Sequence, residues 1–186
     1  MAGFCRGARV ALKILALSGS LRAASSNSAI LRVAARVAVP PIVVATYDAL
    51  GDLPFFNPDL DREFGDPSLP EPVRALRAAI AASDAVLVSS PAYAHGVSGL
   101  LKNALDWLVG GPEMIGKRVA LINTAPHATH AIAAMSETLR TMSVVLVKDA
   151  CLTIAVPRNQ HDAVLSADPS IAGPLGDTLR VLLGRV

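Results

Sequence analysis

The sequence predicts a doubly wound α/β sandwich of three layers, in which helices cover both faces of a five-stranded parallel sheet. Short and almost continuously apolar runs recur along the chain, and segments of helical periodicity separate them. Runs without polar alternation are typical of strands that are covered on both faces, as in a parallel sheet. Because βαβ crossovers are right-handed, the strands fit the order 2-1-3-4-5, with a ligand crevice at the carboxyl ends of the first and third strands.

Each expected strand is a short apolar run. The first run is broken only by Lys13, and the second follows Pro40 and Pro41. The third ends at Ser89, whereas the fourth and fifth contain several β-branched residues. In chain order the expected strands are Val10–Leu17, Ile42–Thr46, Ala85–Ser89, Val119–Asn123 and Val144–Val147.

Helices are expected between and after these strands. Pro72 suits the first turn of its helix, and the Gly-Gly-Pro sequence at residues 110–112 would end the next one. The proline-containing stretch Tyr47–Pro70 is expected to form an irregular flap over the sheet edge where the crevice opens, and residues 158–162 a solvated surface loop. The expected helices are Ser26–Val37, Glu71–Ala82, Val97–Val109, Ala131–Met142 and Ser170–Leu183.

Length and composition favour one domain over residues 1–186, with residues 1–9 as a loose N-terminal extension. A chain of 186 residues that is 52% hydrophobic can bury a substantial core, and no Gly/Ser-rich or Pro-rich hinge divides it. The net charge of +2, without a basic cluster, excludes an electrostatic grip on nucleic acid as the main role. Charged residues make up 17%, which is too few for a disordered chain.

The apolar runs are too short for a membrane span, and we expect a cytoplasmic protein. Lys13 and the Pro40-Pro41 pair interrupt the two longest stretches near the N-terminus, so none approaches the roughly 20 apolar residues that cross a bilayer. A secretory signal is disfavoured because cleavage would destroy the loop that carries the clearest motif. Cys5 and Cys151 form neither a metal pattern nor a CxxC pair, and are expected to be unrelated reduced thiols.

The loop after the first strand, residues 18–27, is the most informative segment. It reads Ser-Gly-Ser-Leu-Arg-Ala-Ala-Ser-Ser-Asn, so five of its ten residues carry a short hydrogen-bonding side chain. Arg22 adds a fixed positive charge and the following helix presents unpaired N–H groups, a combination that suits a phosphate. The alternative is a polar turn in which Ser26 or Asn27 caps the helix. The loop lacks GxGxxG and a Walker lysine, which disfavours the usual modes of dinucleotide or ATP binding.

The loop after the third strand, residues 90–99, is suited to a flat ring. A loop rigidified by Pro91 can place backbone N–H and C=O groups against the edge of such a ring, and Tyr93 can pack on its face or rim. The alternative makes Tyr93 and Trp107 core or interface aromatics, which is the favoured interpretation for Trp107. Ser98 is not a nucleophile elbow, because the GxSxG spacing is broken.

Both loops carry motifs that resemble those of a known family. The first is Gly19-Ser20-Leu21-Arg22 followed by Ser25 and Asn27; the second is Pro91 and Tyr93, then Gly99, then Leu101-Lys102-Asn103-Ala104-Leu105-Asp106-Trp107. They are similar to the phosphate loop and to the Pro-Glu-Tyr-Asn and Leu-Lys-Asn-Ala-Ile-Asp-Trp motifs of the NADPH-dependent FMN reductase family. Its flavodoxin-like members include quinone, azo-dye and chromate reductases. The resemblance covers roughly residues 10–150.

The resemblance implies a flavodoxin-like fold that binds FMN and uses NADPH or NADH as the reductant. The first loop would hold the FMN phosphate, the second would line the isoalloxazine ring through its backbone, and Thr124 would close over the flavin. The helix around residues 103–107 helps to build a dimer in the family, which implies a homodimer or homotetramer. The expected cofactor-binding residues are Ser18, Ser20, Arg22, Ser25, Ser26, Asn27, Pro91, Ala92, Tyr93, Ala94, Thr124 and His127.

Two positions depart from the family pattern, because Ala92 and Ala94 stand where it has Glu and Asn. Alanine keeps its main-chain N–H and C=O, so cofactor binding should survive if the main chain holds the ring, whereas the family's substrate choice and affinity do not carry over to this chain. His95 or His127 is a candidate to replace a lost polar contact. His127 and His130 form an HxxH pair, but no neighbouring Cys or carboxylate completes a zinc set, and no metal is expected.

The leading hypothesis is an FMN-dependent NAD(P)H oxidoreductase that passes hydride through the flavin to a small acceptor, such as a quinone, free flavin or azo compound. Because the flavin makes and breaks the bonds, no side-chain nucleophile or acid is expected to be catalytic. The alternative is a non-catalytic flavin-binding or electron-carrier module. An electron-carrying flavodoxin usually has a strongly acidic docking face, which the +2 charge does not provide.

Overall fold

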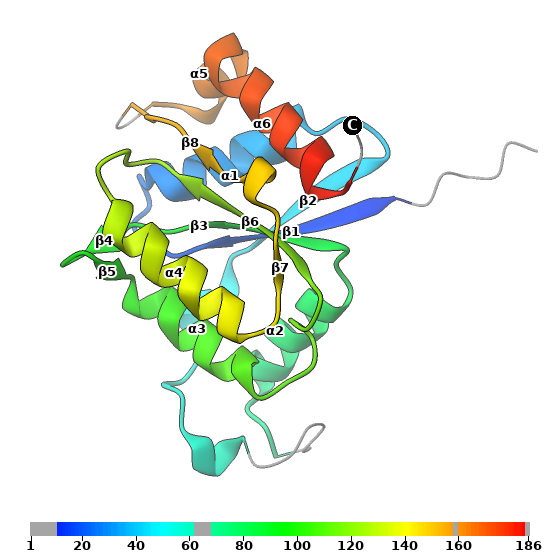
Figure 1. Ribbon diagram of the computed structural model, residues 1–186, viewed down its shortest axis with the longest axis vertical. Helices are drawn as coiled ribbons and strands as arrows, with labels where there is room; N and C mark the ends of the chain where they lie inside the picture. Colours follow the sequence, from blue (N-terminus) through cyan, green and yellow to red (C-terminus); the bar gives the residue numbers. More distant parts are fainter. Residues whose placement is uncertain (1–10, 62–67, 158–159, 185–186) are drawn as a thin grey trace, which may run out of the picture.

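A parallel sheet forms the middle layer of the computed structural model, which describes residues 11–61, 68–157 and 160–184 (Figure 1). In spatial order its strands are β2 (Ile42–Tyr47), β1 (Leu12–Ser18), β3 (Ala85–Ser89), β6 (Arg118–Asn123) and β7 (Val145–Leu146). All four neighbouring pairs are parallel, which confirms the order 2-1-3-4-5. Residues 1–10 lie outside the described part of the chain, and with them the expected N-terminal extension, Cys5 and Val10, the first residue of the first expected strand. Within the described part, this strand begins at Leu12.

Helices cover both faces of the sheet, as Figure 1 shows. The helices are α1 (Ser26–Val37), α2 (Glu71–Ala81), α3 (Gly99–Val109), α4 (Thr129–Thr141), α5 (Asp162–Ala167) and α6 (Pro169–Leu182). Along β1, Ile14 and Ala16 pack with α1 and α6, whereas Leu15 and Leu17 pack with α2, α3 and α4. Consecutive side chains of a strand point to opposite faces, so burial on both faces explains the continuous apolar runs.

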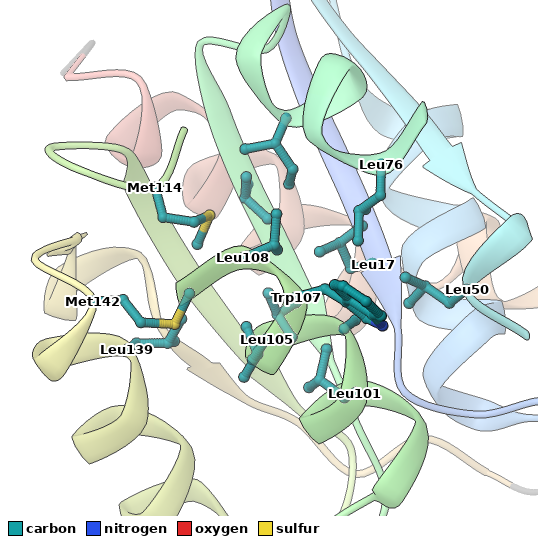
Figure 2. Close-up of a cluster of buried hydrophobic side chains, with 14 of the residues drawn as sticks. Leu17, Leu50, Leu76, Leu101, Leu105, Trp107, Leu108, Met114, Leu139 and Met142 are labelled. Carbon is teal, nitrogen blue, oxygen red and sulfur yellow. The ribbon is translucent and has the colours of Figure 1, made fainter. Parts of the chain in front are cut away.

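The larger of the two cores lies between the sheet and α2, α3 and α4. Figure 2 shows Trp107 at its centre, surrounded by leucines that include Leu17, Leu76 and Leu101. Trp107 is fully buried, which confirms the favoured interpretation of this residue as a core aromatic.

The fifth expected strand, Val144–Val147, is shorter than predicted and is followed by a second segment. After β7 the chain makes a 3₁₀ turn at Lys148–Ala150 and returns as β8 (Leu152–Thr153), and both short strands pair with β6. Between them the N–H of Leu121 lies 3.4 Å from the Cys151 Sγ. The edge strand is therefore interrupted, because the turn removes backbone carbonyls from this part of the ladder.

Two other expectations need correction. The third expected helix begins at Gly99 instead of Val97, because Val97 belongs to a short hairpin and Ser98 caps the helix, accepting from the Leu101 N–H at 3.3 Å. The expected surface loop at residues 158–162 runs directly into α5: His161 is its N-cap and Asp162 its first residue. Residues 158–159 lie outside the described part of the chain.

The expected flap, here residues 48–61, contains two 3₁₀ turns, Ala49–Asp52 and Pro58–Leu60, while residues 62–67 are outside the described chain. Its first turn lies beside the loop that follows β1, where Leu50 and Leu21 line a small cleft. Farther along, the segment packs against α3: Asn103 and Trp107 both donate to the carbonyl of Pro54, at 2.9 and 2.8 Å. No described helix has the length and apolar character needed to cross a membrane.

Candidate functional site

The two loops that the topology selects meet in the structure. Ser18 and Ser89, the last residues of β1 and β3, are register partners, and the N–H of Gly19 donates to the carbonyl of Ser89 at 2.8 Å. The β1–α1 loop (residues 19–25) and the loop after β3 therefore begin side by side at the switch point of the sheet.

Gly19 allows this close approach. A Cβ atom at this position would lie 2.2 Å from the Oγ of Ser90 and 2.8 Å from the Oγ of Ser98. Ser90 and Ser98 are buried, and their hydroxyl oxygens lie 3.1 Å apart, so neither side chain has open space to move into. The glycine of the first motif thus lets the β1–α1 loop rest directly on the second loop.

Gly19→Ala should lower the free energy of unfolding by about 1–3 kcal/mol, the usual cost of forcing extra atoms into a packed site. Gly99→Ala is the matched control, because a Cβ there meets nothing within 4 Å and alanine favours the helix in which it lies. Urea unfolding of both variants measures the difference. Equal stabilities would contradict the close packing of Gly19.

The β1–α1 loop is held by hydrogen bonds in which its serines act as acceptors. The N–H of Ser20 donates to Ser18 Oγ and the N–H of Arg22 to Ser20 Oγ, both at 3.3 Å. Ser25 caps α1 by accepting from the Ser28 N–H at 3.3 Å, so neither Ser26 nor Asn27 is the cap. Since an accepting hydroxyl keeps its own hydrogen, Ser20 and Ser25 can still donate to a ligand.

Arg22 is the cation of this loop that is available to a ligand. Its side chain is exposed, and it forms no ion pair within the part of the chain that the structure describes. Arg32, in α1, is instead paired with Asp162 through two hydrogen bonds, from Nε to Oδ2 at 2.6 Å and from Nη2 to Oδ1 at 3.0 Å. The hydrogen bond from Arg32 lowers the pKa of Asp162, which keeps this pair charged.

Asn27, in the first turn of α1, connects this helix to the ends of β3 and β6 and is buried, with 7% of its surface exposed. Its Oδ1 accepts from the hydroxyl of Ser89 at 2.9 Å and from that of Thr124 at 3.1 Å. The structure thus brings Asn27 and Thr124 together, as the sequence interpretation requires, but uses the carbonyl of Asn27 as a brace. Ser89 is the third member of this hydrogen-bonded group and is not among the residues expected from the sequence. The sequence feature that could have identified it is its position as a polar residue at the end of an apolar strand.

The second loop contains a hairpin of β4 (Ala92–Tyr93) and β5 (Gly96–Val97), an element that the sequence does not predict. Ala94 and His95 occupy its turn with φ of 47° and 63°. Two successive left-handed residues are the requirement of a two-residue hairpin turn, which Asn and Gly normally satisfy. The side chain of Tyr93 is 61% exposed, so within this chain it is not a core aromatic.

A hollow of about 260 Å³ lies between this hairpin and the start of α4, and we call it the histidine hollow. Its lining residues are Ala92, Ala94, His95, His127, Ala128, His130 and Ala131. The rings of His95 and His130 stack, with centroids 5.0 Å apart and planes 11° apart. His95 and His127, the candidates to replace a lost polar contact, therefore lie in the same lining as Ala92 and Ala94, and His130, which was not among the expected cofactor-binding residues, lies there with them.

A second cleft, of about 620 Å³, lies on the other side of the β1–α1 loop, between α1 and α5. Ser25, Ser26, Arg36 and His161 are among the residues that line it. The short helix α5, which was not expected, forms its far wall. The first loop therefore borders open space on the side where its helix begins.

The described residues present no group of three His, Cys, Asp or Glu side chains arranged to hold a metal ion. Burial raises the pKa of the Cys151 thiol, which disfavours a reactive thiolate. What the crevice does offer is hydroxyl and guanidinium donors on one loop, and alanines and histidines around a hairpin on the other. Such a set can bind an anion and a flat ring side by side.

Comparison with known proteins agrees with this geometry. The chain is 39% identical over 118 residues to the probable NADPH:quinone oxidoreductase 2 of Oryza sativa subsp. japonica, covering 62% of this chain and 56% of that protein. It is 35% identical over 116 residues to the quinone reductase of Escherichia coli (strain K12), covering 61% and 60% respectively. The matches thus span less than two thirds of the length of these relatives.

Among solved structures, the flavoenzyme NAD(P)H:(acceptor) oxidoreductase FerB from Paracoccus denitrificans superposes with a TM-score of 0.71 and 27% identity, over 93% of this chain and 96% of that one. The family model of NADPH-dependent FMN reductases matches residues 12–156, a range that includes the β1–α1 loop, the hairpin and the start of α4. With the flavodoxin-like sheet order and the two loops in contact at its switch point, the chain belongs to the NADPH-dependent FMN reductase family.

Proposed function

We propose that the protein is an FMN-dependent NAD(P)H oxidoreductase that passes hydride through bound flavin to a small acceptor, such as a quinone, free flavin or azo compound. The observation that carries this proposal is the β1–α1 loop, which leads into α1 and contains the exposed guanidinium of Arg22, the hydroxyl of Ser20 and the N-cap hydroxyl of Ser25. The positive end of a helix with such donors is a favourable environment for a phosphate monoester.

The residues present fit FMN. Gly19 carries no side chain, so the loop rests on Ser90, and within the loop Arg22 is exposed and Ser20 is half-buried. Ser18 and Ser26 flank the donors, and the amide nitrogen of Asn27, which donates to no described side chain, is a further donor. These residues would bind the phosphate and fix the position of the cofactor.

The hairpin and the neighbouring loops would hold the ring. Residues 91–94 offer main-chain N–H and C=O groups at the edge of the crevice, and the exposed Tyr93 can pack on the ring. Thr124 is fixed by Asn27 next to the same edge, and His127 lies on the rim of the histidine hollow. When bound, FMN supplies the hydride chemistry between NAD(P)H and the acceptor, while these residues orient it and limit the access of water.

Arg22→Ala should weaken FMN binding by about 1.5–3 kcal/mol, the range of a hydrogen bond between charged groups. Arg36→Ala is the matched control, because Arg36 is also exposed but lies in the last turn of α1, on the wall of the second cleft. Quenching of FMN fluorescence gives the dissociation constants. If Arg36→Ala causes the larger loss, the phosphate binds on the outer face of α1 instead of the loop.

Colour separates this function from the alternative of a non-catalytic flavin-binding or electron-carrier module. Protein reconstituted with FMN should be yellow, lose its absorbance when NADPH or NADH is added without oxygen, and regain it with a quinone. Yellow protein that is inert to both nucleotides would favour the module, and failure to take up FMN would exclude both.

We further propose one domain over the whole chain, a cytoplasmic location, and a homodimer or homotetramer. Packing of the last helix supports one domain: α6 contributes Leu175, Leu179 and Leu182 to the same core as α1 and β1. The oligomer is supported by the resemblance of α3 to the helix that helps to build a dimer in the family. Because Trp107 is buried, the exposed residues of α3, such as Lys102 and Val109, would make the contacts between subunits.

A further inference from the structure

We propose that the histidine hollow is a subsite for the acidic substituent of an aromatic electron acceptor, such as a carboxylate, a sulfonate or an ionised ring hydroxyl. The inference rests on the proposed function, because it places the acceptor on the ring that the hairpin would hold. It adds a substrate class, anionic aromatic acceptors, and names the residues that select it: His95, His127 and His130.

The described residues that line the hollow are alanines and histidines, with no acidic side chain among them. Four alanines form its apolar part, and among the described residues that line it the titratable side chains are the three imidazoles. Imidazole N–H groups donate to an oxyanion, and no carboxylate in the lining competes for them. The hollow therefore favours an anion over a neutral group of the same shape.

The position of the hollow joins it to the place expected for the ring. Ala92 and Ala94, two of the residues that would line the isoalloxazine ring, also line the hollow. A ligand can therefore remain stacked on that ring while one of its substituents extends into the hollow. The volume of about 260 Å³ is below the range of about 300–1,000 Å³ typical of whole drug-sized ligands, so it suits one ring or substituent better than a dinucleotide.

The hairpin turn holds one of the histidines in an unusual backbone conformation. His95 has φ of 63° and follows Ala94 at 47°, a left-handed conformation that is unfavourable for residues other than glycine. Strained backbone of this kind is found at ligand clamps. Here it aims His95 across the hollow onto His130, the two rings stacking at 5.0 Å.

Charge around the hollow acts in the same direction. α4 begins at its edge, with Ala128 as N-cap and no side chain capping the first N–H groups, so the positive end of a thirteen-residue helix lies next to the imidazoles. A bound anion would interact favourably with this end of the helix.

Two redox-inert probes of matched shape test the subsite: 2-naphthoate, which is charged, and 2-naphthamide, which is neutral. Their binding to FMN-loaded protein is measured from perturbation of the flavin absorbance and from the NMR shifts of the histidine ring protons. We expect the native protein to bind the naphthoate about tenfold more tightly, and the triple variant His95→Gln/His127→Gln/His130→Gln to lose that preference. His161→Gln, the same change outside the hollow, should keep it.

Equal affinities for the two probes in the native protein would overturn the subsite, as would a preference that survives in the triple variant. So would histidine variants that change only the KM for NADPH, since the anion would then be a phosphate of the reductant. If the triple variant fails to fold, the single variant of the exposed His127 takes its place and should reduce the preference. If the protein takes up no FMN, the proposed function fails, whereas the NMR titration still tests the hollow.

Discussion

Asp61→Ala should lower the free energy of unfolding by about 3–5 kcal/mol, because it leaves the guanidinium of Arg77 buried without its counter-charge. Arg77 Nη2 lies 2.9 Å from Asp61 Oδ1, and the two side chains are only 6% and 8% exposed. The same guanidinium donates to the carbonyl of Trp107 at 2.7 Å, so the ion pair joins the flap, α2 and α3. Chemical denaturation of the variant measures the loss.

An exposed ion pair provides the control. Asp177→Ala removes the partner of Arg180 on the surface of α6, where both side chains are about half exposed or more, and should cost less than about 1 kcal/mol. The double variant Asp61→Ala/Arg77→Met should recover part of the loss, because it removes the unpaired charge. Equal costs for Asp61→Ala and Asp177→Ala would mean that burial does not govern the first pair.

Trp107→Ala should cost about 3–5 kcal/mol, the range for deleting a fully buried large aromatic side chain. Its indole N–H donates to the Pro54 carbonyl at 2.8 Å, and the ring of Phe56 packs edge-on against it with centroids 5.1 Å apart (Figure 2 shows the surrounding leucines). Loss of the indole therefore opens a cavity in the core and frees the flap. Urea unfolding gives the free energy.

Trp107→Phe separates the two contributions. It keeps most of the apolar volume, and the Pro54 carbonyl still accepts from Asn103, so the cost should fall to about 1–2 kcal/mol. Light scattering of both variants shows whether the residue acts through the core or through an oligomer contact. Dissociation of an oligomer without loss of monomer stability would contradict the inward placement of Trp107.

The site could be predicted from the sequence to the level of loops. The sheet order alone points to the loops that follow the first and third strands, and the structure brings these two loops together through Gly19 and Ser89. Individual roles were harder to predict. The cap of α1 is Ser25, because its oxygen reaches the Ser28 N–H, and several serines in one loop cannot be ranked for this role by sequence pattern.

The sequence by itself determined the strands, the main helices and the sheet order, because hydrophobic periodicity and right-handed crossovers are properties of short stretches of chain. Tertiary structure alone decided what depends on partners far along the chain. Asn27 braces Ser89 and Thr124, which are 62 and 97 residues away, and His95 stacks on His130 across the histidine hollow. Such contacts are set by how elements pack, and the edge strand shows the same limit: a turn at Lys148–Ala150 divides it where local apolar pattern predicts continuity.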